Sequence, residues 1–244
     1  MLISAHKSDV GRVRSVNEDR AVVRNGLGGL TFAVVADGMG GHQAGDTASQ
    51  ITVEILQQEL EKLCAEGNLE ECAGHLREAI RQANAKVFEI ASSKEHYRGM
   101  GTTVTAALAD AEHLLIGHIG DSRAYLVNGE DARQLTEDHT LVYELLKSGQ
   151  ITPEEAQLHP RRHVVTRALG TDAEVEIDIE KLSWHSGDTL VICSDGLSNL
   201  VDLEDMIRTL RTDAPLQEKA DLLVQLALDA GGDDNITVVL LNNE

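Results

Sequence analysis

The hydrophobic and polar positions change period along the chain, and each period predicts an element. A short apolar, β-branched run over residues 31–36 stops at Asp37-Gly38, which is typical of a buried strand that ends in a tight turn. Over 44–63, and again over 69–90, apolar residues recur in steps of three and four. This spacing predicts two helices, each with one apolar face, that follow the strand.

From residue 102 onward the pattern becomes that of strands. We expect strands over 102–109, 113–119 and 124–127, with a turn at Gly120-Asp121-Ser122 and a hairpin turn at Asn128-Gly129. Strands that follow one another through short turns predict an antiparallel meander.

A polar segment over about 135–170 then interrupts the strands. Residues 140–148 are typical of a helix, and Thr152-Pro153-Glu154-Glu155 combines a capping box with proline at the first helical position. We therefore expect a mostly helical insertion at this point of the chain.

After the insertion, the chain returns to strands and closes with a helix pair and a last strand. The expected strands cover 175–182, 189–193 and 236–241, and the expected helices cover 202–211 and 215–230. Runs of strands interspersed with antiparallel helix pairs predict the α+β class, with helices packed on sheets, rather than alternating βαβ units.

Composition narrows the class of protein. The 244 residues are 42% hydrophobic, which is enough for a full core and favours one domain over 1–244. Lys and Arg number 21 against 41 Asp and Glu, and the resulting charge of −20 repels nucleic acid and anionic lipid. Aromatic residues make up 2% of the chain, which argues further against a stacking platform for single-stranded nucleic acid.

Cysteine use and the N-terminus indicate where the protein works. Cys64, Cys72 and Cys193 form no Cys-x-x-Cys pair and are too few for a disulfide framework, so we expect reduced thiols, mostly in the core. No signal peptide opens the chain, and no apolar run approaches the length of a membrane span. We expect a cytoplasmic protein that is not inserted into a membrane.

Acidic motifs occur where predicted strands begin or end. They are Asn17-Glu18-Asp19, the run from Ala36 to His42, Ser194-Asp195-Gly196 and the run from Gly231 to Asn235. An unpaired buried charge costs several kcal/mol, so a cluster of carboxylates implies a cation that neutralises it. Carboxylate, carbonyl and water oxygens suit Mg²⁺ or Mn²⁺, whereas the Cys and His spacings of a zinc site are missing. The motifs predict a divalent-metal enzyme.

Seven short motifs, taken in order, resemble those of the bacterial branch of the type 2C, metal-dependent (PPM) serine/threonine protein phosphatases. The resemblance runs from about residue 3 to 241. The motifs are 14–19, 37–42, Gly101-Thr102-Thr103, 120–125, 166–170, 194–196 and 234–237.

The resemblance implies a fold and a set of metal ligands. The fold is a four-layer αββα sandwich, in which two antiparallel sheets are flanked by antiparallel helix pairs and a flap covers 135–170. Asp37 is expected to bridge two metals, and the Gly38 carbonyl to reach one of them. The other expected ligands are Asp195 and Asp234, Asp19 through bound water, and Asp121 for a third, weaker ion.

The resemblance also assigns residues to the substrate. Arg14 is expected to bind the substrate phosphate, and Glu18 stands where animal relatives often have a further acidic contact. The general-acid histidine of animal relatives falls on Met39 here, so the leaving group takes its proton from His42, from a metal-bound water or from neither.

Each of these assignments has a structural alternative. A helix cap or a hairpin turn would explain Asp19 or Asp121, and a surface ion pair would explain Arg14. Asp37, Asp195 and Asp234 could likewise be turn residues, but their place in three of the motifs favours metal ligation.

The expected chemistry follows from two dications about 4 Å apart, between which bound water becomes hydroxide near neutral pH and attacks phosphorus. We expect Mn²⁺- or Mg²⁺-dependent hydrolysis of phosphoserine and phosphothreonine on cytoplasmic proteins by a monomer that opposes a serine/threonine kinase. One alternative is a phosphatase of a phosphorylated anti-sigma-factor antagonist. The other is a non-catalytic pseudophosphatase that binds phosphoprotein, which the presence of all three core aspartates disfavours.

Overall fold

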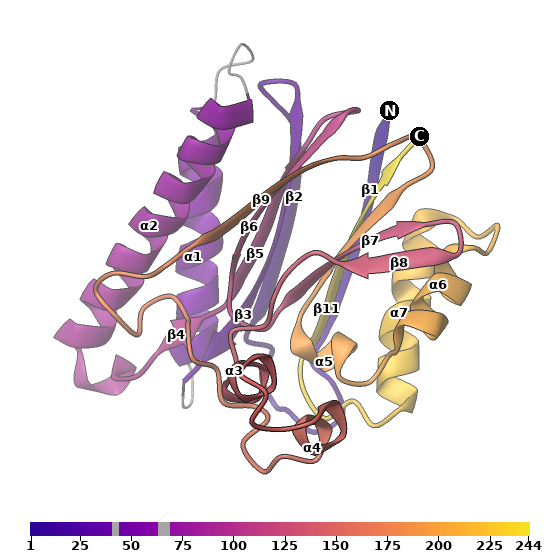
Figure 1. Ribbon diagram of the computed structural model, residues 1–244. Coiled ribbons are helices and arrows are strands. Elements are labelled where there is room, and N and C mark those ends of the chain that lie inside the picture. Colours follow the sequence, from indigo (N-terminus) through magenta and orange to yellow (C-terminus); the bar gives the residue numbers. More distant parts are fainter. Residues whose placement is uncertain (41–43, 63–68) are drawn as a thin grey trace.

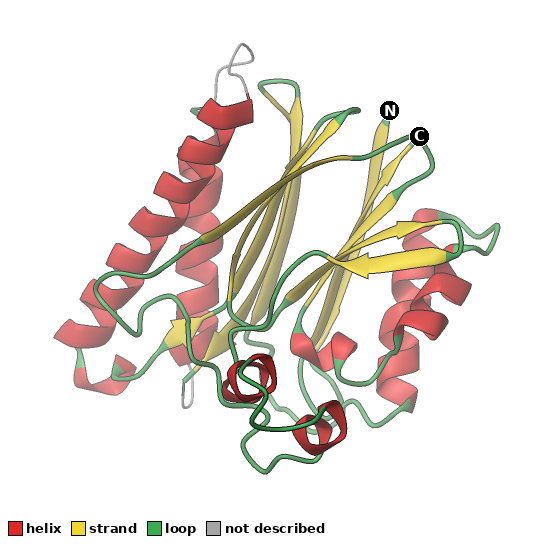
Figure 2. Cartoon of the chain, in the orientation of Figure 1, coloured by secondary structure: helices red, strands yellow, loops and turns green. Residues whose placement is uncertain are grey.

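Two antiparallel sheets stack face to face, and helices cover the outer face of each (Figures 1 and 2). The computed structural model describes residues 1–40, 44–62 and 69–244. This is the predicted α+β class with the layer order αββα, which is thereby confirmed. In the described part of the chain, no helix is both long enough and apolar enough to cross a membrane.

The first sheet contains both ends of the chain. Its strand order is β1 (Leu2–Asp9), β11 (Ile236–Asn243), β10 (Thr189–Cys193), β7 (Arg123–Asn128) and β8 (Asp131–Gln134). All neighbouring pairs are antiparallel, and Leu2 lies opposite Asn243. Both termini therefore lie together at one end of the sandwich (Figure 1).

The second sheet follows the order β2 (Asp19–Leu27), β3 (Leu30–Met39), β5 (Val104–Ala109), β6 (His113–Ile119) and β9 (Asp178–Ser183). The short strand β4 (Gly101–Thr102) pairs with the end of β3. Helices α1 (Ala44–Leu60) and α2 (Leu69–Ser93) pack on this sheet, and a 3-10 turn (Glu95–Tyr97) follows them.

The period of two along β3 separates two hydrophobic cores. Phe32, Val34 and Ala36 contact the apolar faces of α1 and α2, whereas Ala33 and Val35 point into the core between the sheets. A third core joins the first sheet to α5 (Asp195–Ser198), α6 (Leu203–Leu210) and α7 (Leu216–Asp229). Because both of its faces are buried, β3 appears in the sequence as a continuous apolar run.

The predicted meander is wrong at its third strand. β7 pairs with β10 and β8 in the first sheet, and not with β6 in the second. The chain changes sheets at Gly120, whose φ of +111° and close approach to Thr103 leave no room for a side chain. Asp121 consequently lies where the two sheets meet. The predicted hairpin turn at Asn128-Gly129 is confirmed.

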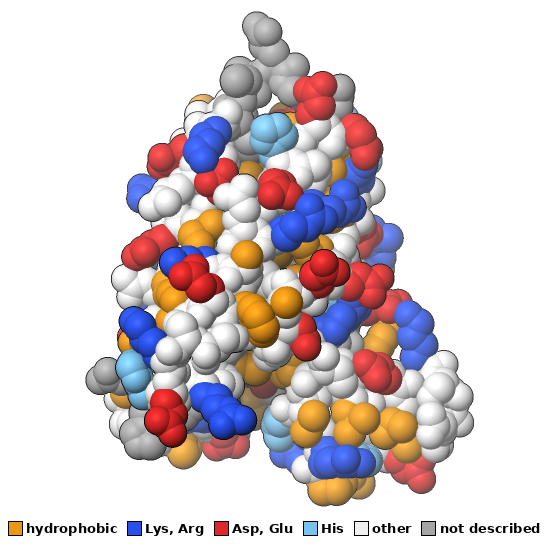
Figure 3. Space-filling view, turned by 90° about the vertical axis from the view of Figure 1, so that its left-hand side faces the viewer, with side chains coloured by type: hydrophobic (Ala, Val, Ile, Leu, Met, Phe, Trp, Pro, Cys, Tyr) orange, Lys and Arg blue, Asp and Glu red, His pale blue; other side chains and the backbone are white. Residues whose placement is uncertain are grey.

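The insertion over 135–170 is also less helical than predicted. It holds two short helices, α3 (Leu141–Lys147) and α4 (Pro153–Gln157), and the rest is irregular. Thr152 forms the predicted capping box at the start of α4. The insertion forms a lobe at the lower right of Figure 3, on which hydrophobic side chains gather. Leu158 of this insertion is 83% exposed.

The two cysteines that the structure describes lie in the core, as expected from the sequence. Cys72 and Cys193 are both buried, and Cys193 is the last residue of β10. Cys64 lies outside the described residues.

Candidate metal and phosphate site

A cavity of about 1170 Å³ opens at the end of the sandwich opposite the termini. The β1–β2 loop, the end of β3, the β6–β7 turn, the start of α5, the loop before β11 and the insertion all contribute to its wall. Of the residues predicted for the site, it is lined by Arg14, Asp37, Gly38, Asp121, Asp195 and Asp234.

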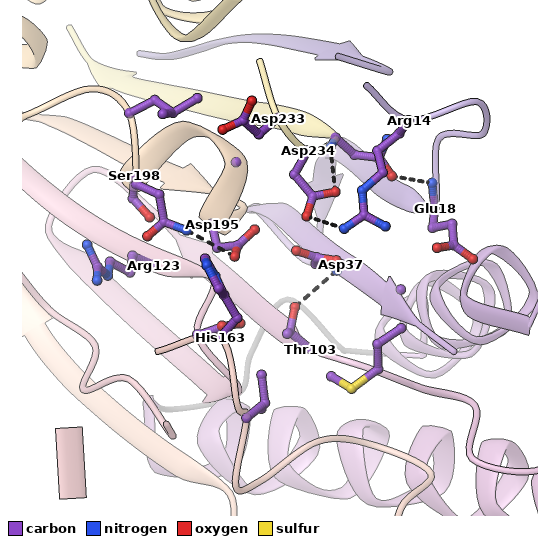
Figure 4. A pocket seen from close by; sticks show the side chains of 18 of the residues that line it. Arg14, Glu18, Asp37, Thr103, Arg123, His163, Asp195, Ser198, Asp233 and Asp234 are labelled. Atoms are coloured by element: carbon purple, nitrogen blue, oxygen red, sulfur yellow. Dashed lines mark hydrogen bonds and ion pairs between the residues drawn. The ribbon is translucent and has the colours of Figure 1, made fainter. Parts of the chain in front are cut away.

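Asp37 is held by its backbone, which leaves its carboxylate to face the cavity. Its N–H donates to Thr103 Oγ1 (3.0 Å), and its carbonyl accepts from the Thr103 N–H (2.8 Å) and from Thr102 Oγ1 (2.8 Å). The carboxylates of Asp37, Asp195 and Asp234 point toward one another (Figure 4). The motif at 101–103 therefore fixes the end of the strand that carries Asp37.

A glycine brings Asp195 and Asp234 together. Asp195 begins α5, and a Cβ on the following Gly196 would lie 2.0 Å from the Asn235 carbonyl oxygen. Only glycine allows the first turn of α5 to pack directly on the backbone next to Asp234. Asn199 Nδ2 donates to Asp195 Oδ2 (3.1 Å) and orients that carboxylate.

Arg14 contacts the acidic cluster directly. Its Nη2 donates to Asp234 Oδ2 (2.7 Å), and 51% of its side chain is exposed. An exposed pair of this kind contributes little to stability. The guanidinium is therefore available to an anion that enters the cavity.

Asn235 fixes the loop that carries Arg14. Its Nδ2 donates to the carbonyls of Val10 (2.9 Å) and Val16 (3.0 Å), and its Oδ1 accepts from the Glu18 N–H (2.8 Å). These bonds hold both ends of the loop next to Asp234. Asn235 was expected only as part of a motif, and its role becomes visible through its burial and its distant partners.

Asp19 lies behind the cavity rather than on its wall. It is 2% exposed and sits directly opposite Asp37 on the neighbouring strand. Its Oδ2 accepts from Ser194 Oγ (2.7 Å), while its Oδ1 has no hydrogen-bond partner among the described residues. Burial raises the pKa of Asp19 to about 7. An unpaired buried carboxylate oxygen beside Asp37 suits a water or a hydrated cation.

Ionisation of the carboxylates that face the cavity is also disfavoured, as it is for Asp19. Burial and the charges of Asp19 and Asp195 hold the pKa of Asp37 well above its usual range. Burial and the charge of Asp195 raise the pKa of Asp121 to about 7, and burial and Asp234 raise that of Asp195. A cation would remove this penalty, and an all-oxygen donor set fits Mg²⁺ or Mn²⁺.

The site is open rather than a closed cage. Among residues 1–40, 44–62 and 69–244, no three His, Cys, Asp or Glu side chains lie close enough together to enclose a metal ion by themselves. Mg²⁺ keeps several waters and takes few carboxylates, so an open arrangement of aspartates is compatible with it.

The structure also brings polar residues to the site that the sequence analysis missed. Arg123 forms a two-pronged pair with Asp138, with Nε to Oδ1 at 2.9 Å and Nη2 to Oδ2 at 2.6 Å, next to Asp121. Arg123 is the first residue of the apolar strand β7, and a charged residue at the start of this strand was the signal for the pair. His163 of the insertion also lines the cavity, whereas the predicted His42 lies outside the described residues.

Comparison with known proteins gives one consistent result. Residues 11–229 match the family model described as protein phosphatase 2C. The serine/threonine phosphatase stp of Listeria monocytogenes is 41% identical over 238 residues, which are 98% of this chain and 94% of that protein.

Solved structures agree with the sequence comparison. The serine/threonine phosphatase of S. agalactiae superposes with a TM-score of 0.96 at 36% identity and covers all of both chains. The catalytic domain of the serine/threonine protein phosphatase PstP, solved with two manganese ions, superposes with a TM-score of 0.85 at 38% identity and covers 99% and 97% of the two chains.

Proposed function

Because the chain belongs to the protein phosphatase 2C family, we infer that it is a metal-dependent serine/threonine phosphatase that acts on phosphorylated proteins. The alternatives of an anti-sigma-factor pathway and of a pseudophosphatase are not favoured, since the similar proteins are named serine/threonine phosphatases. We further propose that 1–244 is one catalytic domain with a flap over 135–170.

We propose that Asp37, Asp195 and Asp234 hold two core cations, with the Gly38 carbonyl and a water on Asp19 as further ligands. The convergence of the three carboxylates on one cavity is the observation that carries this proposal. Divalent cations bound there would lower the pKa of a coordinated water and offset the negative charge of the phosphate. Asp121, at the meeting point of the sheets, is proposed to hold a third, weaker cation. Mn²⁺ and Mg²⁺ both suit these oxygen ligands.

Arg14 is proposed to bind the substrate phosphate. Its pair with Asp234 is exposed and uses one nitrogen, so turning the guanidinium toward a phosphate costs little. Guanidinium donates two parallel hydrogen bonds to phosphate oxygens, each stronger than a bond between neutral groups. Arg14 would thus orient the phosphorus atom over the carboxylate cluster. We propose His42 as the donor of the proton that the leaving alkoxide takes up.

The biological setting is also a proposal. We propose that the enzyme acts as a monomer in the cytoplasm and reverses the action of a serine/threonine kinase. The charge of −20 supports protein substrates over nucleic acid or anionic lipid.

The test is hydrolysis of phosphothreonine, phosphoserine and phosphotyrosine peptides by purified protein that has first been stripped with a chelator. We expect turnover of the first two only after Mn²⁺ or Mg²⁺ is added. Turnover that survives chelation, or none with either metal, would contradict the proposal. For the third cation, Asp121→Ala should lower kcat while calorimetry still detects the tight Mn²⁺ sites.

A further inference from the structure

A second cavity of about 320 Å³ lies beneath the flap and continues from the cavity that holds the carboxylates. The two share a boundary of residues that contribute to both walls: Asp121, Arg123, Gln157, Arg162, His163, Asp195 and Asn199. A phosphoprotein bound at the metal site would therefore lie next to this second cavity.

The flap side of this cavity is apolar. Val142 and Leu146, one helical turn apart on α3, line it together with Tyr143, and Pro153 and Ala156 line it from α4. Neither helix has a fully buried side chain. Each short helix thus presents its apolar stripe to a cavity instead of packing the stripe against the core.

The acidic groups that line the cavity already have partners, and Arg162 of the flap adds a positive charge to its wall. Asp138 is neutralised by the two-pronged pair with Arg123. Asp121 and Asp195 belong to the proposed cation sites. The described lining residues thus leave no unpaired acidic group for a lysine or arginine of the ligand, and Arg162 would repel one, whereas the apolar wall remains available.

We propose that this cavity binds an apolar side chain of the phosphoprotein substrate, and this proposal rests on the proposed phosphatase function. Its volume accommodates one side chain of leucine size. An extended peptide advances about 3.3 Å per residue, and the two cavities share a wall. The apolar residue therefore lies within about three positions of the phosphorylated one.

The cavity makes the enzyme prefer such substrates by a measurable amount. Burial of one leucine side chain, compared with alanine, changes kcat/KM by roughly ten- to a hundredfold. A small substrate such as para-nitrophenyl phosphate does not reach beneath the flap and reports on the metal site alone.

The experiment measures hydrolysis of phosphothreonine peptides by the full-length chain. In these peptides leucine, alanine or lysine is placed in turn at each position from three before to three after the phosphothreonine. We expect leucine to exceed alanine by at least about tenfold at one or two positions. Leu146→Ala, which enlarges the cavity, and Ala156→Leu, which fills it, should each bring that ratio close to one. The ratio is measured within one enzyme preparation, so partial misfolding of a variant cancels.

Leu145→Ala is the matched control, because Leu145 is the neighbouring residue on α3 and does not line the cavity. Its leucine-to-alanine ratio should equal that of the wild type. A flat ratio in the wild type, a ratio that survives both cavity variants, or a preference for lysine would overturn the proposal. Absence of turnover of both peptides and para-nitrophenyl phosphate would instead overturn the phosphatase function itself.

Discussion

His139 accepts a hydrogen bond on Nδ1 from the backbone N–H of Gly120 (3.0 Å), and the backbone N–H of His139 donates to the Gly120 carbonyl (2.8 Å). Gly120 precedes Asp121, and His139 stands at the first stem of the flap. On the other side, Nε2 donates to Asp178 Oδ2 (2.9 Å), and the His139 carbonyl accepts from the Thr166 N–H (2.7 Å). One residue, through its ring and its backbone, therefore joins the turn of Asp121 to both stems of the flap and to the start of β9.

The two halves of this contact can be separated by substitution. His139→Asn keeps an acceptor near Nδ1 for Gly120, whereas His139→Gln keeps a donor near Nε2 for Asp178. A buried N–H without an acceptor costs about 1–3 kcal/mol, and Asp178 is more exposed than Gly120. We expect the Gln variant to lose more stability and more kcat/KM than the Asn variant, measured by urea unfolding and by peptide hydrolysis. Equal losses would mean that the bond to Gly120 has no special weight.

Asp37→Asn should abolish turnover without unfolding the protein. An amide offers one neutral oxygen in place of two charged ones, so affinity for the cations should be lost. Because burial and neighbouring carboxylates raise the pKa of Asp37, removal of its charge should leave the metal-free protein at least as stable as the wild type. Thermal unfolding in chelator and hydrolysis in saturating Mn²⁺ test both halves.

Asp213→Asn, in the exposed loop between α6 and α7, serves as the control for charge alone and should behave as the wild type. Near wild-type hydrolysis by Asp37→Asn would remove Asp37 from the site.

Arg14→Ala should raise KM by roughly ten- to a hundredfold, because a charge-assisted contact with phosphate is lost. Its pair with Asp234 is half exposed, so the free energy of unfolding should change by less than about 0.5 kcal/mol. Arg12→Ala is the control: Arg12 lies in the same loop, bonds to the end of α7 and does not line the cavity. Steady-state kinetics on a phosphothreonine peptide decide the matter, and a KM equal to that of Arg12→Ala would make Arg14 a surface residue.

The stabilisation that Mn²⁺ gives should grow as the pH rises from about 5 to about 7.5. The pKa values of Asp19 and Asp121 are raised to about 7, while an unfolded aspartate titrates near 3.9. Above about pH 4 the unfolded chain has already released the protons that the metal-free fold holds until it titrates near pH 7, so the metal-free fold loses stability as the pH rises through this window. A cation that binds the ionised carboxylates offsets this loss.

Urea unfolding with Mn²⁺ and with chelator, compared at each pH, measures this difference. His118 has its pKa lowered to about 4 by burial and by the nearby His139, and it acts in the opposite sense: its contribution is lost as the pH falls from about 6.5 to about 4. That contribution is the same with and without metal and cancels in the comparison. A difference that does not vary with pH would contradict the prediction.

The helices and the acidic motifs could be predicted from the sequence more completely than the pairing of the strands. The stripes of α1 and α2 and the buried run of β3 are local patterns, and each predicted its element. β7 has the same local pattern whichever sheet it joins, so its partner depends on the turn at Gly120 and on long-range packing. β2 was not predicted because Arg20, Arg24 and Asn25 break its alternation.

Some residues of the candidate site could also be predicted from the sequence, and others could not. Aspartates in recognisable motifs could be placed on one cavity from the sequence, because short segments carry them. The roles of His139 and Asn235 could not, since a buried polar side chain in a loop differs from an exposed one only through its distant partners. His139 bonds to Gly120, which is 19 positions away in the sequence. Asn235 bonds to Val10 and Val16, which are more than 200 positions away.

Asp37 stands on the second sheet, whereas Asp195 and Asp234 follow and precede strands of the first. Their mutual repulsion therefore acts across the gap between the sheets, and only at the end of the sandwich where the cavity opens. At the other end, the hydrophobic core between the sheets holds them together. Loss of the cations would thus loosen the sandwich at one end, and amide exchange in the 36–39, 120–122 and 194–196 segments should accelerate there while β1 and β11 stay protected near the termini.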